Sequence, residues 1–155
     1  MPVRRLQEYL DKQHVPYTTQ RHEPAYTTSE VAELAHVPGQ EIAKTVMVKL
    51  DGTLAMAVLP GCCRVDLERL GALAGATVIE LATECEFRDR FPYCAIGAMP
   101  PFGNLYGVPV FVAARLALDE EIVFNAGTHA ELMRLRFTDF DRLVRPIIGR
   151  FAVPL

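Results

Sequence analysis

Apolar positions along the chain recur at helical spacing in some segments and at strand spacing in others. Val3, Leu6, Tyr9 and Leu10 fall on one side of an opening helix, with Lys and Asp on the other side. Residues 16–22 are rich in strand formers and predict a first strand. The chain is therefore expected to begin with a helix followed by a strand.

The next segment carries signals for both ends of a helix. Thr27-Thr28-Ser29-Glu30 has the pattern of a capping box, in which a hydroxyl and a carboxylate satisfy the first free amides of a helix. Pro38-Gly39 predicts the end of this helix after about His36.

The clearest local pattern is a β-hairpin. The strand-like segments 44–50 and 53–59 flank Asp51-Gly52, a two-residue loop that tolerates positive φ at both positions. The two segments are expected to pair antiparallel, and Pro60-Gly61 closes the hairpin.

Helix caps and short strands follow the hairpin. Asp66 is expected to cap a helix that ends at Gly75, and residues 77–81 predict a short strand. Thr83 with Glu86 predicts the start of another helical turn.

The last third of the chain predicts three strands and a closing helix. The strands are expected over residues 110–113, 122–125 and 131–136. Thr138 with Asp141 predicts a last capping box, and Pro146 ends that helix.

These elements predict an α+β fold. Six or seven strands and about five helices occur in mixed order, so the sheet is expected to be mixed and mostly antiparallel. The chain has 155 residues with no internal repeat and no low-complexity linker. A single domain over residues 1–155 is expected.

Composition and charge narrow the functional classes. Half of the residues are apolar, which is enough for a real core, and the formal net charge is −3. That charge excludes a histone-like DNA binder, so any contact with RNA requires a local basic patch and should show a shallow salt dependence. Such contacts could come from either end of the chain: Arg4, Arg5 and Lys12, or Arg134, Arg136, Arg142, Arg145 and Arg150.

The cysteines and the N-terminus predict a soluble cytoplasmic protein. None of the cysteine spacings is the Cys-x-x-Cys of a zinc or redox motif, so these residues read as core thiols in a reducing compartment. The opening residues show no apolar run of a secretory signal. The four cysteines are Cys62, Cys63, Cys85 and Cys94.

An uncharged stretch over residues 91–114 is long enough to suggest a membrane span. Four prolines and three glycines within it would break such a helix repeatedly. The stretch is expected to form the wall of a buried pocket instead.

Three segments carry candidate chemistry. Lys44 begins an apolar strand: if its side chain points inward, its charge requires a partner or a ligand, and otherwise it is a strand-end lysine that reaches solvent. Residues 97–103 combine glycine freedom with proline rigidity, which suits either a backbone donor site or a rigid loop. His129 follows a glycine turn and could act on a proton or be structural.

The sequence lacks the motifs that are typical of several enzyme classes. It has no Gly-x-Ser-x-Gly elbow, no phosphate loop, no dinucleotide glycine fingerprint and no His-Glu-x-x-His zinc helix.

The three segments, in this order, resemble the YbaK family of aminoacyl-tRNA editing domains, which occur free-standing and inserted in prolyl-tRNA synthetases. The resemblance covers nearly the whole chain. It is carried by Ala43-Lys44-Thr45-Val46, Gly97-x-x-x-Pro101 with Phe102-Gly103, and Asn125-Ala126-Gly127-Thr128-His129.

The resemblance implies hydrolysis of mischarged tRNA in trans, without a metal, a cofactor or a covalent enzyme intermediate. It implies a partly barrel-like sheet, and Lys44 and His129 are expected to be catalytic. Lys44 or the amides near Gly97 could stabilise the developing oxyanion, and Lys44 could equally hold the terminal phosphate while the neighbouring ribose hydroxyl helps to activate the water. Substrate binding is expected from the residues around Lys44 and His129: Thr45, Gly97, Ala98, Met99, Pro100, Pro101, Phe102, Gly103, Ala126, Gly127 and Thr128.

The expected substrate is a small amino acid such as Ala, Cys or Ser on tRNA(Pro) or a related tRNA. Besides aminoacyl-tRNA, the expected partners include an aminoacyl-tRNA synthetase, but neither DNA nor a membrane. Two rivals stay open: a non-catalytic module that holds an aminoacyl end or a synthetase, and a thiol-based redox or metal protein using Cys62 and Cys63.

Overall fold

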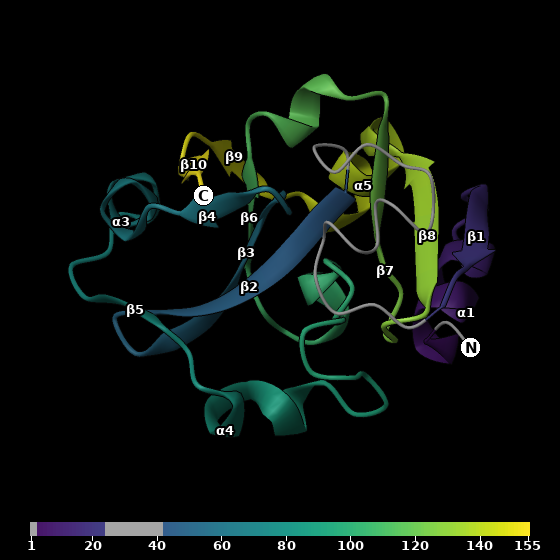
Figure 1. Cartoon of the computed structure of the whole chain (residues 1–155), viewed down its shortest axis with the longest axis horizontal. Helices are drawn as coiled ribbons and strands as arrows, with labels where there is room; N and C mark the ends of the chain where they lie inside the picture. Colours follow the sequence, from purple (N-terminus) through teal and green to yellow (C-terminus); the bar gives the residue numbers. More distant parts are fainter. Residues whose placement is uncertain (1–2, 24–41) are drawn as a thin grey trace.

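The computed structural model describes residues 3–23 and 42–155, and Figure 1 shows their arrangement. The helix expected over residues 27–36 lies outside this range. The helices are α1 (Arg4–Lys12), α3 (Leu67–Ala74), α4 (Glu84–Phe87) and α5 (Phe137–Val144), with short 3-10 turns at Arg88–Arg90, Gly103–Leu105 and Leu116–Leu118. The strands are β1 (Tyr17–Arg21), β2 (Ile42–Leu50), β3 (Thr53–Pro60), β4 (Cys63–Val65), β5 (Ile79–Leu81), β6 (Val110–Ala113), β7 (Glu121–Asn125), β8 (Glu131–Arg136), β9 (Ile147–Gly149) and β10 (Ala152–Pro154).

The expected α+β fold with a mixed sheet is confirmed. Eight strands form one sheet in the order β1-β8-β7-β2-β3-β6-β9, with β5 paired to β2, and β4 pairs separately with β10. Neighbours in the large sheet are antiparallel except for β2–β7, β3–β6 and β6–β9. Within the described residues the sheet is open, with β1 and β9 at its edges. The short strands β4, β9 and β10 were missed because three residues carry little periodicity.

The hairpin and most of the caps occur as predicted. Asp51 and Gly52 both have positive φ, as their loop requires, and the Asp66 side chain accepts a hydrogen bond from the amide of Arg69. Asp51 Oδ1 also accepts from the amide of Val78, 2.7 Å away, which ties the hairpin to the start of β5.

The capping box of α4 is present, and the one predicted for α5 is wrong. The amide of Thr83 donates to Glu86 Oε1 at 2.8 Å. The Lys49 ammonium bonded to the same carboxylate, and after it this amide, lower the pKa of Glu86 to about 2. In α5, by contrast, β8 runs directly into the helix, so Arg136 occupies the cap position and Thr138 already lies inside the first turn.

Both faces of the sheet are covered by apolar residues. Alternate residues of β3 enter two separate core clusters: Met56 packs on the face covered by α1 and α5, and Ala57 packs on the face covered by α3. This division decides on which side of the sheet each candidate side chain lies. In the described residues, no helix is both long and apolar enough to cross a membrane.

Candidate functional site

Two of the three candidate segments are joined directly by backbone hydrogen bonds. The amide of Ala95 donates to the carbonyl of Gly127 at 2.8 Å, and the amide of Gly127 donates to the carbonyl of Ala98 at 2.9 Å. We call this contact of residues 95–98 with residues 126–129 the loop–turn junction. Because each of the two segments both donates and accepts a backbone hydrogen bond, the positions of Gly97 and the turn are fixed relative to each other.

The side chain of His129 also crosses this junction. Its Nε2 atom lies 2.8 Å from the carbonyl oxygen of Ile96, and because a carbonyl only accepts, Nε2 is the donor. A Cβ atom built on Gly97 would lie 3.4 Å from Cε1 of the same ring. His129 therefore packs against the exposed Gly97, whose φ of 86° lies in the left-handed region.

The glycine turn is anchored from two other directions. The Thr128 hydroxyl donates to Glu131 Oε2 at 3.2 Å and accepts from the amide of Ala130 at 3.3 Å. The amide of Val3 donates to the buried carbonyl of Ala126 at 2.9 Å, so the start of α1 holds the turn as well.

Lys44 reaches the same end of the sheet through strand pairing. β2 runs parallel to β7 with Ala43 opposite Phe124, so the next residue along each strand places Lys44 beside Asn125. Asn125 is the last residue of β7 and leads directly into the glycine turn. The three candidate segments therefore approach one another at the carboxyl end of β7.

The Lys44 side chain leaves the sheet on the face covered by α3. Ala43 and Met47 enter the core on the α1 side, and alternation sends Lys44 to the opposite face. Its Nζ atom lies 3.4 Å from the carbonyl oxygen of Gly61, and burial lowers the pKa of the ammonium, an effect that the nearby thiols partly oppose. Lys44 is half-buried, so it is neither a fully buried ammonium that requires a partner nor a strand-end lysine that extends freely into solvent.

Asn125 is a polar group that sequence reasoning left out of the site. Its Oδ1 atom is buried and has no hydrogen-bond partner among the described residues. Phe124 enters the core on the α1 side, so alternation puts the Asn125 side chain on the same face as Lys44. An asparagine at the end of the apolar run Ile122-Val-Phe was the available signal. We call the group formed by Lys44, Gly61 and Asn125 the Lys44 corner.

The candidate segment over residues 97–103 lies within the stretch that was expected to form the wall of a pocket. It belongs largely to the core instead. The Phe102 ring is fully buried, and its centroid lies 5.7 Å from that of Phe124 and 5.4 Å from that of Phe140. Met99 lies in the same cluster. Apolar rings and a thioether thus fill the space beneath the sheet, and contact of these two side chains with the substrate stays a prediction.

The remaining predicted residues have mixed placements. Pro100, Pro101, Gly103 and Ala98 are buried beside Phe102. Thr45 is half-buried and alternation turns it to the opposite face from Lys44. The structure thus brings Lys44, Gly97, Ala126, Gly127, Thr128 and His129 to one end of the sheet.

The described part of the chain holds neither a cluster of metal-binding side chains nor a disulfide bond. No group of three or more His, Cys, Asp or Glu side chains there is arranged to hold a metal ion. All four cysteines are free thiols, but Cys62 and Cys85 are exposed, so the expectation of core thiols is wrong for these two. The sulfurs of Cys62 and Cys63 lie 4.0 Å apart. Burial raises the pKa of the Cys63 thiol, which keeps it protonated and neutral near pH 7.

The chain is similar in sequence to a known protein family and to individual known proteins. The family model described as the aminoacyl-tRNA editing domain matches residues 22–143. The chain is 27% identical over 153 residues to the multifunctional Ser/Thr-tRNA deacylase ProXp-y of Escherichia coli strain K12, covering 95% of this chain and 90% of that protein. It is also 31% identical over 109 residues to a proline--tRNA ligase of Leuconostoc citreum, covering 68% of this chain but 18% of the ligase.

Solved structures share the fold. A proposed trans-editing enzyme for prolyl tRNA synthetase superposes with a TM-score of 0.82 at 22% identity, covering 97% of this chain and 96% of the other. A hypothetical protein superposes with a TM-score of 0.86 at 20% identity, covering 96% of this chain and 99% of the other.

Proposed function

Because this chain belongs to the aminoacyl-tRNA editing domain family, we propose that it hydrolyses the ester that links a misattached amino acid to the terminal ribose of a tRNA. The observation that carries this proposal is the approach of Lys44, Gly97 and His129 at the end of β7. A half-buried ammonium and an exposed glycine at the same end of the sheet suit a substrate that is a polar ester.

In the proposed reaction, a water oxygen attacks the ester carbonyl and gives a tetrahedral intermediate with negative charge on the former carbonyl oxygen. This intermediate collapses by breaking the bond to the ribose oxygen, which takes up a proton, and the amino acid leaves as a carboxylate. The ester is already activated, so the protein mainly needs to position the water and stabilise the developing charge.

The residues divide these tasks between them. Lys44 is the cation that stabilises the oxyanion, because its ammonium is partly desolvated and its contact with Gly61 is long at 3.4 Å. Gly97 gives the ester access to bare backbone. His129 positions the Gly97 segment through its bond to Ile96.

The proposed substrates are small amino acids, such as Ala, Ser or Cys, on tRNA(Pro) or a related tRNA, removed in trans. The name of the Escherichia coli relative, a Ser/Thr-tRNA deacylase, supports a small side chain. The matched ligase of Leuconostoc citreum supports a partnership with prolyl-tRNA synthesis. A pocket excludes larger side chains by sterics, whereas one methylene of added contact is worth only about 1–3 kcal/mol.

Hydrolysis of a defined panel tests the proposal. The purified chain is mixed with tRNA(Pro) charged with Ala, Ser, Cys, Thr or Pro, and the ester remaining is measured over time. We expect multiple turnovers on at least one small amino acid and sparing of Pro-tRNA(Pro). Tight binding of these RNAs with no turnover on any of them would favour the non-catalytic binding module and overturn the enzyme.

A further inference from the structure

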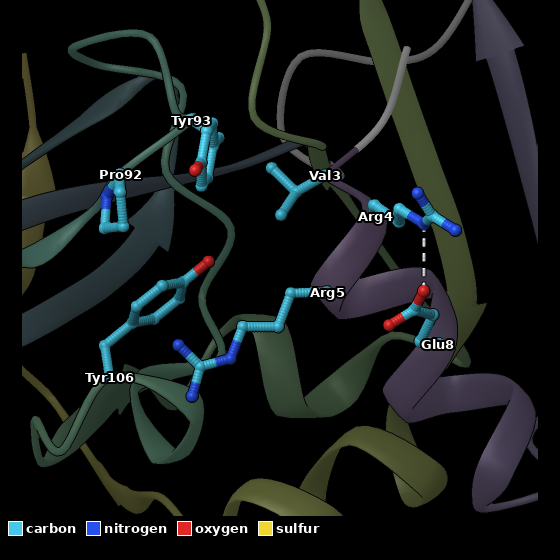
Figure 2. A pocket seen from close by; sticks show the side chains of 7 residues that line it. All are labelled: Val3, Arg4, Arg5, Glu8, Pro92, Tyr93 and Tyr106. Atoms are coloured by element: carbon cyan, nitrogen blue, oxygen red, sulfur yellow. Dashed lines mark hydrogen bonds and ion pairs between the residues drawn. The ribbon is translucent and has the colours of Figure 1, made fainter.

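A cavity of about 300 Å³ lies beside the loop–turn junction, on the side away from Lys44. Figure 2 shows its lining side chains, which come from the start of α1 and from the segment between α4 and β6. Mostly apolar surface faces the cavity. The side chains used below are Val3, Arg4, Arg5, Pro92, Tyr93 and Tyr106.

Tyr93 presents a large ring to solvent at the mouth of this cavity. The residue is 95% exposed, although tyrosines are usually at least partly covered. Its backbone has a φ of 69°, in the left-handed region, which costs a non-glycine residue about 1–2 kcal/mol. The fold therefore holds an apolar ring outward at an energetic cost, next to Pro92, as Figure 2 shows.

Arg5 supplies positive charge on the other side of the cavity. Its guanidinium lies over the Tyr106 ring, 5.2 Å from the centroid, so it is held in place by a cation–π contact. The neighbouring Arg4 is paired with Glu8 at 2.9 Å, which neutralises the acidic group of the lining. Among the described residues, Arg5 has no ion pair of this kind.

Val3 links the cavity to the glycine turn of the candidate site. The Val3 side chain lines the cavity, its amide holds the carbonyl of Ala126, and a Cβ atom on Gly127 would collide with its Cγ2 atom. Ala95, two residues after Tyr93, is bonded to the same glycine turn. A polynucleotide whose last ribose lies at the turn would have its neighbouring nucleotide at this cavity.

We propose that the cavity binds an unpaired nucleotide adjacent to the aminoacylated end of the RNA. The base stacks on Tyr93 and the apolar wall, and Arg5 contacts a phosphate. Exposed aromatic rings with nearby arginines are how proteins hold single-stranded RNA without a large basic surface. This inference rests on the proposed function, since it assigns a part of the same substrate to a second place on the protein.

A second arginine-lined cavity supplies the matched control. It has a volume of about 340 Å³ and is lined by Arg69, Arg115 and Arg150, but no aromatic ring lines it. It lies between α3, β6 and β10 rather than beside the glycine turn. A nucleotide site made by positive charge alone would use this cavity at least as well.

The first experiment compares Tyr93→Ala, Tyr93→Phe and Arg69→Ala on two substrates, aminoacyl-tRNA and the isolated aminoacyl-adenosine ester. For Tyr93→Ala we expect KM for aminoacyl-tRNA to rise about 10-fold, as the loss of one stacked base predicts. The aminoacyl-adenosine ester, which has no neighbouring nucleotide, should be hydrolysed as by the wild type. Tyr93→Phe and Arg69→Ala should leave the hydrolysis of both substrates unchanged. An equal loss on both substrates for Tyr93→Ala would overturn the proposal.

A binding measurement separates this inference from the proposed function. A fluorescent single-stranded oligoribonucleotide ending in CCA is titrated with each variant over a range of salt. Tyr93→Ala should weaken binding about 10-fold, and Arg5→Gln should weaken it and reduce the salt slope by about 1. This result would support the cavity even if no ester is hydrolysed. Equal binding by the wild type and Tyr93→Ala, or a loss with Arg69→Ala of the same size, would overturn it.

Discussion

The two sides of the candidate site are held in different ways. The loop–turn junction is fixed by reciprocal backbone hydrogen bonds between Ala95, Ala98 and Gly127, and by the His129 ring across Ile96. In the Lys44 corner, the ammonium has one long contact of 3.4 Å to Gly61, and the buried Oδ1 of Asn125 has no partner in the described part of the chain.

The loop–turn junction therefore serves as a scaffold, whereas the Lys44 corner holds the groups that can act on a substrate. Backbone hydrogen bonds at the junction satisfy their own groups, so that side of the site is stable without a ligand. Polar groups in the Lys44 corner are partly desolvated without full compensation, which costs stability and leaves hydrogen-bonding capacity for a substrate. Changes in the corner should therefore alter activity, and changes at the junction should alter stability.

The largest expected effect on activity is that of Lys44→Ala. Removing one donor to an oxyanion lowers kcat by about 10²–10³-fold, while the free energy of unfolding should stay unchanged or rise because a half-buried charge is lost. Single-turnover hydrolysis and thermal denaturation measure the two quantities. The control is Lys49→Ala, on the same strand, whose ammonium pairs with Glu86. Activity retained in Lys44→Ala would mean that the group that stabilises the oxyanion does not lie in the Lys44 corner.

Gly127→Ala tests the other side of the comparison. The added Cβ meets the Val3 side chain, and the φ of 95° is unfavourable for alanine, so we expect a loss of about 2–4 kcal/mol of unfolding free energy. Gly107 also has positive φ but no atom within 4 Å of its Cβ position. Gly107→Ala should therefore cost only about 1 kcal/mol. Chemical denaturation compares the two, and equal losses would mean that the contact with Val3 contributes nothing.

The pH dependence of hydrolysis gives a smaller effect from the Lys44 corner. Burial disfavours the charged ammonium and lowers the pKa of Lys44, so the rate should fall as pH rises through a value below that of a free lysine. In Lys44→Arg the guanidinium stays charged, and any residual activity should lose this alkaline decline. For the same reason, the contribution of Lys44 to stability should increase with pH in the wild type and not in the variant. An identical alkaline decline in both proteins would assign it to another group.

The sequence predicted local structure well because local rules decide it. The hairpin at Asp51-Gly52 and the cap at Asp66 depend on φ preferences and on hydrogen bonds within a few residues. The cap of α5 was misplaced because β8 continues without a loop into the helix, a tertiary constraint that acts on Arg136. Strands β9 and β10 depend on pairing with distant partners, β6 and β4, which no short pattern encodes.

The candidate site was only partly predictable for the same reason. Lys44, Gly97 and His129 stand out as residue types, but their approach depends on the parallel pairing of β2 with β7 and on bonds between Ala95, Ala98 and Gly127. Phe102 resembles a pocket residue in sequence, and only packing shows that it is core. Tertiary structure thus decides which residues of a motif face a ligand.

Replacing both Cys62 and Cys63 with serine should have the smallest effect on activity. It distinguishes a direct role of the Lys44 ammonium from a role of the neighbouring thiols. The two thiols lie near Lys44 and partly counteract the lowering of its pKa, but the Cys63 thiol is itself protonated near pH 7. Serine preserves a small neutral group at both positions, so we expect the activation free energy to change by no more than about 0.5 kcal/mol. A change of this size alters kcat by about twofold. A loss as large as that of Lys44→Ala would instead make a thiol the reacting group, and the ammonium would then act by stabilising its thiolate.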